Sequence, residues 1–84
     1  MINGRRRQDM MMVYDLMFDN AKERQYQVKN DTGVGYLTIN KTDGSVAMTG
    51  SFSSMFDPEF IKELASGTLK FKTNPPKHFA YGVG

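Results

Sequence analysis

Apolar and polar residues alternate over most of the first half of the chain, and this alternation predicts β-strands. From Met10 to Asp19 every even-numbered residue is apolar, whereas the odd-numbered residues include Asp15 and Asp19. Successive side chains of a strand point to opposite faces, so a period of two indicates a strand. The same alternation predicts three more strands, at residues 24–29, 34–40 and 45–52. The connections between them are rich in Asn, Asp and Gly, and an Asp-Gly pair before the fourth strand indicates a hairpin.

A helix is predicted directly after the fourth strand, from Pro58 to about Ser66. Asp57 can act as the N-cap because its carboxylate accepts the free N–H groups of the first turn, and proline is favoured at the first helical position. Gly67 is predicted to end the helix as its C′ residue. The apolar stripe consists of Phe60, Ile61, Leu64 and Ala65.

A fifth strand is predicted over residues 68–73, with Leu69 and Phe71 directed inward and Lys70 and Lys72 directed outward. The order strand-strand-strand-strand-helix-strand then predicts an α+β fold, a small antiparallel meander of four to five strands with one short helix. A chain of 84 residues leaves room for one domain. We expect this domain at residues 10–73, between a basic N-terminal tail (1–9) and a proline-containing C-terminal tail (74–84).

One short helix leaves part of this sheet uncovered. Nine helical residues span about 13 Å and can cover only part of one face of a sheet. Because the first and third strands carry apolar residues on both faces, we predict a protein interface formed by Met11, Val13, Met17, Leu37 and Ile39. Two alternatives stay open: a C-terminal segment with Phe79 and Tyr81 could cover the second face, or the strands could curl into a small barrel.

Composition strengthens the expectation of a partner. The chain is 39% hydrophobic and 24% charged, as in globular proteins, and has seven methionines and no cysteine. A domain this small gains little stability from its core alone, and disulfides are excluded. Self-association, most simply as a dimer, is therefore expected, and methionine-rich surfaces suit adaptable contacts.

The charges are distributed unevenly. The net charge is +2, but residues 8–67 hold nine acidic and five basic residues, a net charge of −4. The positive charge lies towards the two ends of the chain. A nucleic-acid site, the alternative to a protein interface, is predicted from basic residues near the ends and aromatic residues of the sheet: Arg5, Arg6, Arg7, Tyr26, Tyr36, Lys70 and Lys72.

Catalytic and metal chemistry have little support. The acidic pairs Asp15 with Asp19 and Glu59 with Glu63 share a predicted face, but solvated carboxylates are the simpler interpretation. The one histidine, His78, has no acid near it in sequence and is expected to be exposed and inert. We therefore expect no enzyme, cofactor, metal site or small-molecule substrate. No secretion signal or membrane segment is recognisable, so a cytoplasmic location without membrane contact is expected.

These observations predict a small non-enzymatic binding or regulatory protein that acts through protein–protein contacts, of the inhibitor or adaptor type that phages and mobile elements encode. The alternative is a single-stranded nucleic-acid-binding protein. The predicted order of four strands and a helix resembles that of Whirly-type and coactivator-type single-strand binders, a resemblance that implies a dimer.

Overall fold

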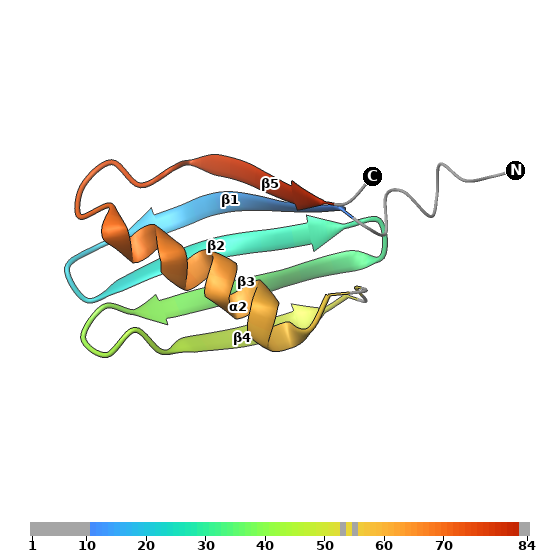
Figure 1. The fold of residues 1–84 in the computed structure, drawn as a ribbon, viewed down its shortest axis with the longest axis horizontal. Helices are drawn as coiled ribbons and strands as arrows, with labels where there is room; N and C mark the ends of the chain where they lie inside the picture. Colours follow the sequence, from blue (N-terminus) through green and yellow to red (C-terminus); the bar gives the residue numbers. More distant parts are fainter. Residues whose placement is uncertain (1–10, 53, 55, 83–84) are drawn as a thin grey trace, which may run out of the picture.

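A computed structural model describes residues 11–52, 54 and 56–82 of the chain. Its elements, in chain order, are β1 (Met11–Asp19), β2 (Glu23–Asn30), β3 (Gly33–Asn40), β4 (Val46–Ser51), helix α2 (Pro58–Ser66), the 3₁₀ turn η1 (Gly67–Lys70) and β5 (His78–Gly82). The five strands form one open antiparallel sheet in the order β4-β3-β2-β1-β5 (Figure 1). The predicted small α+β fold is confirmed.

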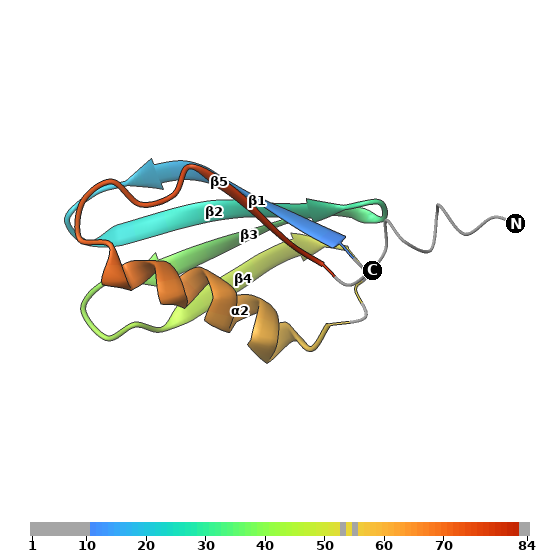
Figure 2. The ribbon, with the colours of Figure 1, turned by 45° about the horizontal axis from the view of Figure 1, so that its top comes forward.

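Helix α2 crosses one face of the sheet and buries the core against it (Figure 2). Its start follows the sequence prediction, since the Asp57 side chain accepts a hydrogen bond from the Glu59 N–H at 2.9 Å and Pro58 is the first helical residue. The core consists of inward residues of three central strands and two helical residues: Met12, Tyr14, Tyr26, Val28, Leu37, Ile39, Ile61 and Ala65. Tyr14 also donates a hydrogen bond to the Ile61 carbonyl at 3.1 Å, which links the helix to the sheet.

The predicted fifth strand at residues 68–73 is wrong. The chain continues to coil after the helix, because Gly67 keeps right-handed backbone angles (φ −60°, ψ −21°) instead of the left-handed ones expected of a C′ glycine. Hydrogen bonds then close η1: the Thr68 hydroxyl donates to the Ala65 carbonyl at 2.7 Å, and the Phe71 N–H donates to the Thr68 carbonyl at 3.0 Å.

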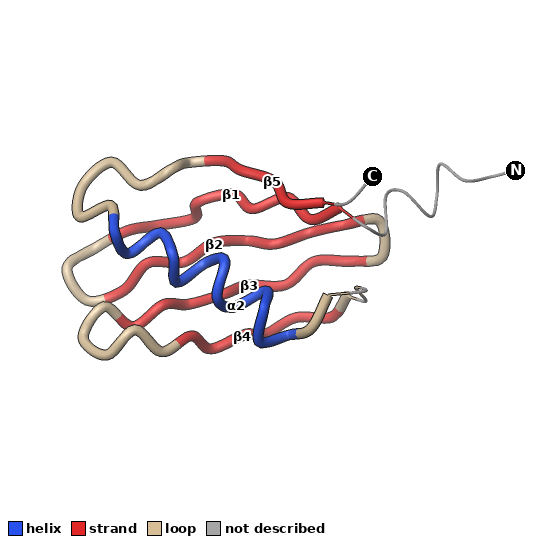
Figure 3. Tube along the Cα trace, viewed as in Figure 1, coloured by secondary structure: helices blue, strands red, loops and turns tan. Residues whose placement is uncertain are grey.

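The fifth strand lies instead at residues 78–82, within the segment expected to be a tail. It pairs with β1, with Tyr81 opposite Met12 and Phe79 opposite Tyr14. Phe79 stacks on Tyr14 with ring centroids 4.5 Å apart, so this segment extends the sheet at its edge and adds to the helix-covered side. The loop that leads from the helix to β5 is seen in Figure 3. One alternative was that the segment with Phe79 and Tyr81 covers the second face of the sheet, and in the structure this segment does not do so.

A β-bulge between Leu16 and Phe18 interrupts the alternation of β1. One extra residue in a strand reverses which face the following side chains occupy. Phe18 therefore lies opposite Gln25, on the side away from the helix, and Asp19 lies opposite Arg24. The uninterrupted alternation of the sequence instead predicted Phe18 on the same face as Tyr14 and Asp19 on the same face as Asp15.

Candidate functional site

We name the side of the sheet opposite α2 the open face. Figure 2 shows the helix on one side only, and no other element of residues 11–52, 54 and 56–82 covers the other side. Its central residues, given by the strand alternation and register, are Met11, Val13, Asp15, Gln25, Gln27, Lys29, Val34, Tyr36 and Thr38.

The middle of the open face is polar, and its polar side chains pair with one another. Gln25 donates to the Thr38 hydroxyl at 3.1 Å, and Gln27 donates to the Tyr36 hydroxyl at 3.2 Å, in both cases between β2 and β3. At the β1–β5 side, Asp15 lies 2.6 Å from Nδ1 of His78. Internally paired polar groups need less water, so this surface is easier to desolvate than its composition indicates.

Exposed apolar side chains lie at both ends of the open face. At one end Met11 (48% exposed) and the half-buried Val13 lie on β1, and Val34 (38% exposed) lies on β3, with Lys29 of β2 between the two valines. Met11 and Val13 line a shallow hollow of about 250 Å³ together with Lys29, Asn30 and Asp31. At the bulge end Met17 and Phe18 are also exposed. The open face therefore offers apolar contact area on either side of a polar centre.

The structure divides the five residues predicted as a protein interface. Met11, Val13 and Met17 are accessible on the β1 side of the open face or at the bulge. Leu37 and Ile39 are completely buried in the core beneath the helix, because Leu37 pairs with Tyr26 on the inward face. Alternation correctly separated the two faces of β3 and of β1 before its bulge, but it does not say which face of β3 aligns with which face of β1.

The residues predicted as a nucleic-acid site do not come together either. Arg5, Arg6 and Arg7 lie outside the described residues. Tyr26 is completely buried and donates its hydroxyl to the Pro76 carbonyl at 2.6 Å, so its ring cannot stack on a base. Tyr36 lies on the open face, Lys70 ends η1 and Lys72 lies in the loop before β5, so the two lysines share no strand.

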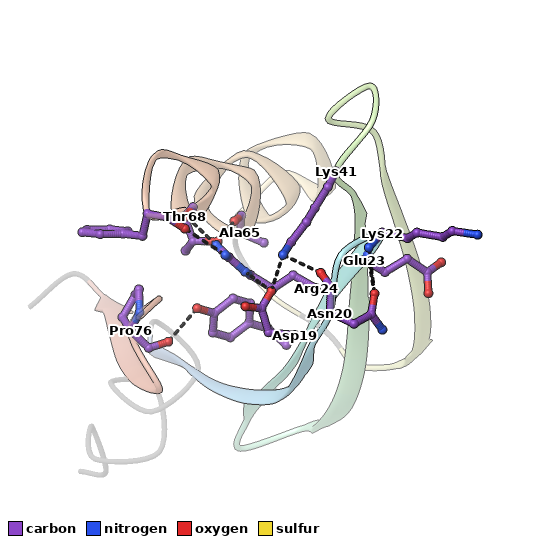
Figure 4. Close-up of polar contacts among 11 residues, drawn as sticks. Asp19, Asn20, Lys22, Glu23, Arg24, Lys41, Ala65, Thr68 and Pro76 are labelled. Carbon is purple, nitrogen blue, oxygen red and sulfur yellow. Dashed lines mark hydrogen bonds and ion pairs between the residues drawn. The ribbon is translucent and has the colours of Figure 1, made fainter. Parts of the chain in front are cut away.

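A buried arginine joins the sheet to the turn that follows the helix (Figure 4). The Arg24 side chain is 1% exposed and donates from Nε to Asp19 at 2.8 Å, from Nη1 to the Thr68 carbonyl at 2.5 Å and from Nη2 to the Phe71 carbonyl at 2.8 Å. Lys41 also reaches Asp19 at 2.8 Å. Hydrogen bonds from Arg24, and then from Lys41, hold the pKa of the Asp19 carboxyl below its usual value.

Sequence reasoning missed this network, although one signal was present. Arg24 is in phase with Tyr26 and Val28, so the alternation of β2 places its side chain on the inward face. A charged residue in phase with a buried stripe requires buried partners. Those partners, the Thr68 and Phe71 carbonyls, lie 44 and 47 residues away in sequence.

A second hollow lies on the helix side of the sheet, between the end of α2 and β5. It measures about 330 Å³, and its apolar lining consists of Leu64, Phe71, Pro76 and Phe79. Glu63 and Lys70 also line it. The Lys70 ammonium lies 5.3 Å from the centre of the Phe71 ring, which is exposed to 41%. We name this hollow the α2–β5 groove.

The acidic residues and the histidine are dispersed except for one pair. His78 contacts Asp15, which is 63 positions away, so the expectation of a histidine without a nearby acid holds only in sequence. Asp19 belongs to the Arg24 network, and Glu59 pairs with Lys62 at 3.4 Å. Within the described part of the chain, no three His, Cys, Asp or Glu residues are grouped so as to hold a metal ion.

The same part of the chain contains no helix with the length and apolar character needed to cross a bilayer. Comparison with known proteins identifies no matching family model, no matching curated protein and no matching solved structure.

Proposed function

We propose that this protein is a small binding or regulatory protein that acts through protein–protein contacts, with the open face as its contact surface and a second copy of the chain as the occupant. The observation that carries the proposal is the exposure of Met11 on β1 and Val34 on β3 at the same end of a sheet face that no described element covers. Exposed apolar groups that lie together are typical of interaction sites.

The size of the open face suits a dimer. Five strands about 4.8 Å apart, each about 20–25 Å long, give a flat area of roughly 500 Å². Side-chain relief raises the accessible area above that value, towards the ~800 Å² that each partner contributes to a standard interface. Aligned packing of two sheet faces is also a common way to build a core between sheets.

The charge of the open face favours a second copy over a nucleic acid. Among its central residues Lys29 and Asp15 balance each other, so two copies do not repel and phosphate is not attracted. A two-fold axis makes the same patch meet itself, which allows each Lys29 to approach Asp15 or Asp31 of the second copy. Tyr26, which the nucleic-acid alternative requires on the surface, is buried in the core.

Sedimentation equilibrium over a range of protein concentrations tests the proposal. We expect the unaltered chain to be a dimer and the double variant Met11→Lys/Val34→Lys to be a monomer, because like charges are then placed in the interface. Both positions are exposed, so the variant should keep the circular dichroism spectrum of the unaltered chain. The matched control, Ala21→Lys/Thr42→Lys, adds the same charges at exposed turn positions and should remain dimeric.

Two results would count against the proposal. One is an unaltered chain that stays monomeric at every concentration. The other is a double variant that dimerises as well as the unaltered chain. Salt-dependent binding of a labelled single-stranded oligonucleotide, lost when Arg5, Arg6 and Arg7 are replaced, would favour the alternative function.

A further inference from the structure

No strand of the described residues pairs with the outer edge of β5. Strand β5 has one neighbour, β1, and the other side of its backbone faces away from the sheet (Figure 1). The Leu16 N–H donates to the Lys77 carbonyl at 2.9 Å, and in antiparallel pairs the hydrogen-bonded positions alternate. The main-chain N–H and C=O groups of His78 and Ala80 therefore point outward.

This edge lacks the usual protection against pairing. Natural edge strands often carry proline, lysine or other charged residues that discourage another strand from binding. The β5 sequence His-Phe-Ala-Tyr-Gly contains no proline, lysine, aspartate or glutamate. An extended segment of another chain can therefore add to β5 through main-chain hydrogen bonds, a common mode of peptide recognition.

The α2–β5 groove lies beside this edge, on the helix side. Phe79 belongs to β5 and lines the groove together with Leu64, Phe71 and Pro76. In a strand paired with β5, alternate side chains point to the helix side, where one of them can enter the groove. A leucine or phenylalanine side chain suits its apolar walls.

The surroundings of the groove are basic. Lys70 lines it, and Lys72 and Lys77 directly follow the lining residues Phe71 and Pro76. All three lysines are exposed, and none forms an ion pair with another described residue. From Leu64 to the end of the sequence there is no aspartate or glutamate, so Glu63 is the one acidic residue in the lining.

The Arg24 network fixes one wall of the groove. Arg24 donates to the carbonyls of Thr68 and Phe71, and both residues line the groove. The Phe71 ring, which is substantially exposed, is therefore attached to a backbone held by a buried charge. A wall that is already ordered loses less entropy when a ligand binds.

From these observations we infer a second docking surface, which takes an extended segment of a partner protein that carries one large apolar residue next to acidic residues. The segment pairs with the free edge of β5, inserts its apolar side chain into the α2–β5 groove and directs its carboxylates to Lys70, Lys72 and Lys77. The groove lies on the side of the sheet opposite the open face, so this inference is independent of the proposed dimer.

Fluorescence anisotropy with short labelled peptides tests the ligand chemistry. The reference peptide alternates glutamate and threonine around a central leucine. We expect binding that weakens with salt, and a loss of about tenfold or more when the leucine is replaced by alanine or when the amides that face β5 are N-methylated. A peptide with lysine in place of glutamate should not bind measurably. Equal binding of all four peptides would overturn the inference.

Protein variants locate the site. Lys70→Glu should weaken binding of the reference peptide about fivefold. Its control, Lys22→Glu, reverses an exposed charge in the turn between β1 and β2 and should leave binding unchanged. Ala80→Pro removes an outward N–H without removing a hydrogen bond to β1, and a loss of about tenfold is expected. If Ala80→Pro does not fold, Lys70→Glu and the N-methylated peptide still decide the question.

Three further outcomes are informative. Met11→Lys/Val34→Lys should keep its affinity for the peptide, so failure of the dimer proposal and failure of this inference are distinguishable. A labelled oligonucleotide that binds in place of the peptide and is weakened by Lys70→Glu would overturn the inference in favour of a nucleic-acid ligand. Self-association abolished by Ala80→Pro would show that a second copy occupies the edge instead.

Discussion

Replacing the buried Arg24 should destabilise the fold more than replacing a charged surface side chain such as Lys62. Its guanidinium is almost completely buried and donates to the Asp19 carboxylate and to the carbonyls of Thr68 and Phe71. Together these bonds connect β2, the end of β1 and the turn after the helix. The variants Arg24→Ala and Arg24→Met remove all of them, but only alanine also removes the aliphatic volume.

The expected magnitudes follow from the surroundings of each acceptor. Thr68 is buried, so its carbonyl loses a partner out of reach of water, which costs about 1–3 kcal/mol. Phe71 is exposed and its carbonyl can bind water instead, while Asp19 keeps Lys41 at 2.8 Å. We therefore expect Arg24→Met to lower the free energy of unfolding by about 1–3 kcal/mol. The cavity left by alanine raises the loss for Arg24→Ala to about 3–5 kcal/mol.

Urea unfolding followed by circular dichroism measures these differences. A domain of this size often has only about 3–5 kcal/mol of stability, so Arg24→Ala should be largely unfolded without urea and Arg24→Met should remain measurable. The control Lys62→Ala removes the exposed 3.4 Å contact with Glu59 and should change stability by less than about 0.5 kcal/mol. An Arg24→Ala variant within about 1 kcal/mol of the unaltered protein would refute the assignment of Arg24 as a structural link.

Four further predictions concern single positions. In the folded protein the pKa of Asp19 lies below its unfolded value of about 3.9. The ionised carboxylate therefore stabilises the fold fully above that pH, and this stabilisation is lost as the pH falls towards the folded pKa. Asp19→Asn should reduce the fall of the melting temperature over this acidic range. Gly67→Ala should stabilise by about 0.4–1 kcal/mol, because φ is −60° and no atom lies within 4 Å of an added Cβ. Gly50→Ala should destabilise the fold by about 1 kcal/mol or more, because φ is +100° and the added Cβ would lie 2.5 Å from the Val34 carbonyl oxygen. A Gly50→Ala variant that melts at a higher temperature than Gly67→Ala would contradict both glycine predictions. Asp57→Ala should cost about 1 kcal/mol in urea unfolding, with Asp57→Ser recovering most of it; no difference between the two would exclude the cap as the cause.

Local signals account for the features that sequence reasoning predicted correctly. The first four strands follow from alternation between polar connections, and the helix start follows from Asp57 and Pro58. Such signals act between residues a few positions apart, so they can be read without knowledge of the rest of the fold. The misplaced fifth strand had comparable local support, since residues 68–73 and 78–82 both alternate. What separates them is pairing: Phe79 finds Tyr14 on β1, whereas residues 67–70 coil onto the end of the helix.

The candidate sites depended on relations that no local pattern contains. The interface prediction placed Leu37 and Ile39 on the same surface as Met11, because β1 and β3 both have apolar residues on two faces. In the structure the strand register places Leu37 and Ile39 in the core instead. The contact of His78 with Asp15 and the Arg24 bonds to the turn after the helix join residues more than 40 positions apart.

The sequence by itself determined the class of fold, the order of its elements and the two sides of each regular strand, because periodicity and capping are properties of neighbouring residues. Tertiary structure alone decided which sides share the core, which residues flank the free edge of β5 and which charge is buried. These depend on strand register, on the bulge in β1 and on contacts between the two halves of the chain, where a shift of one residue exchanges the buried and exposed faces.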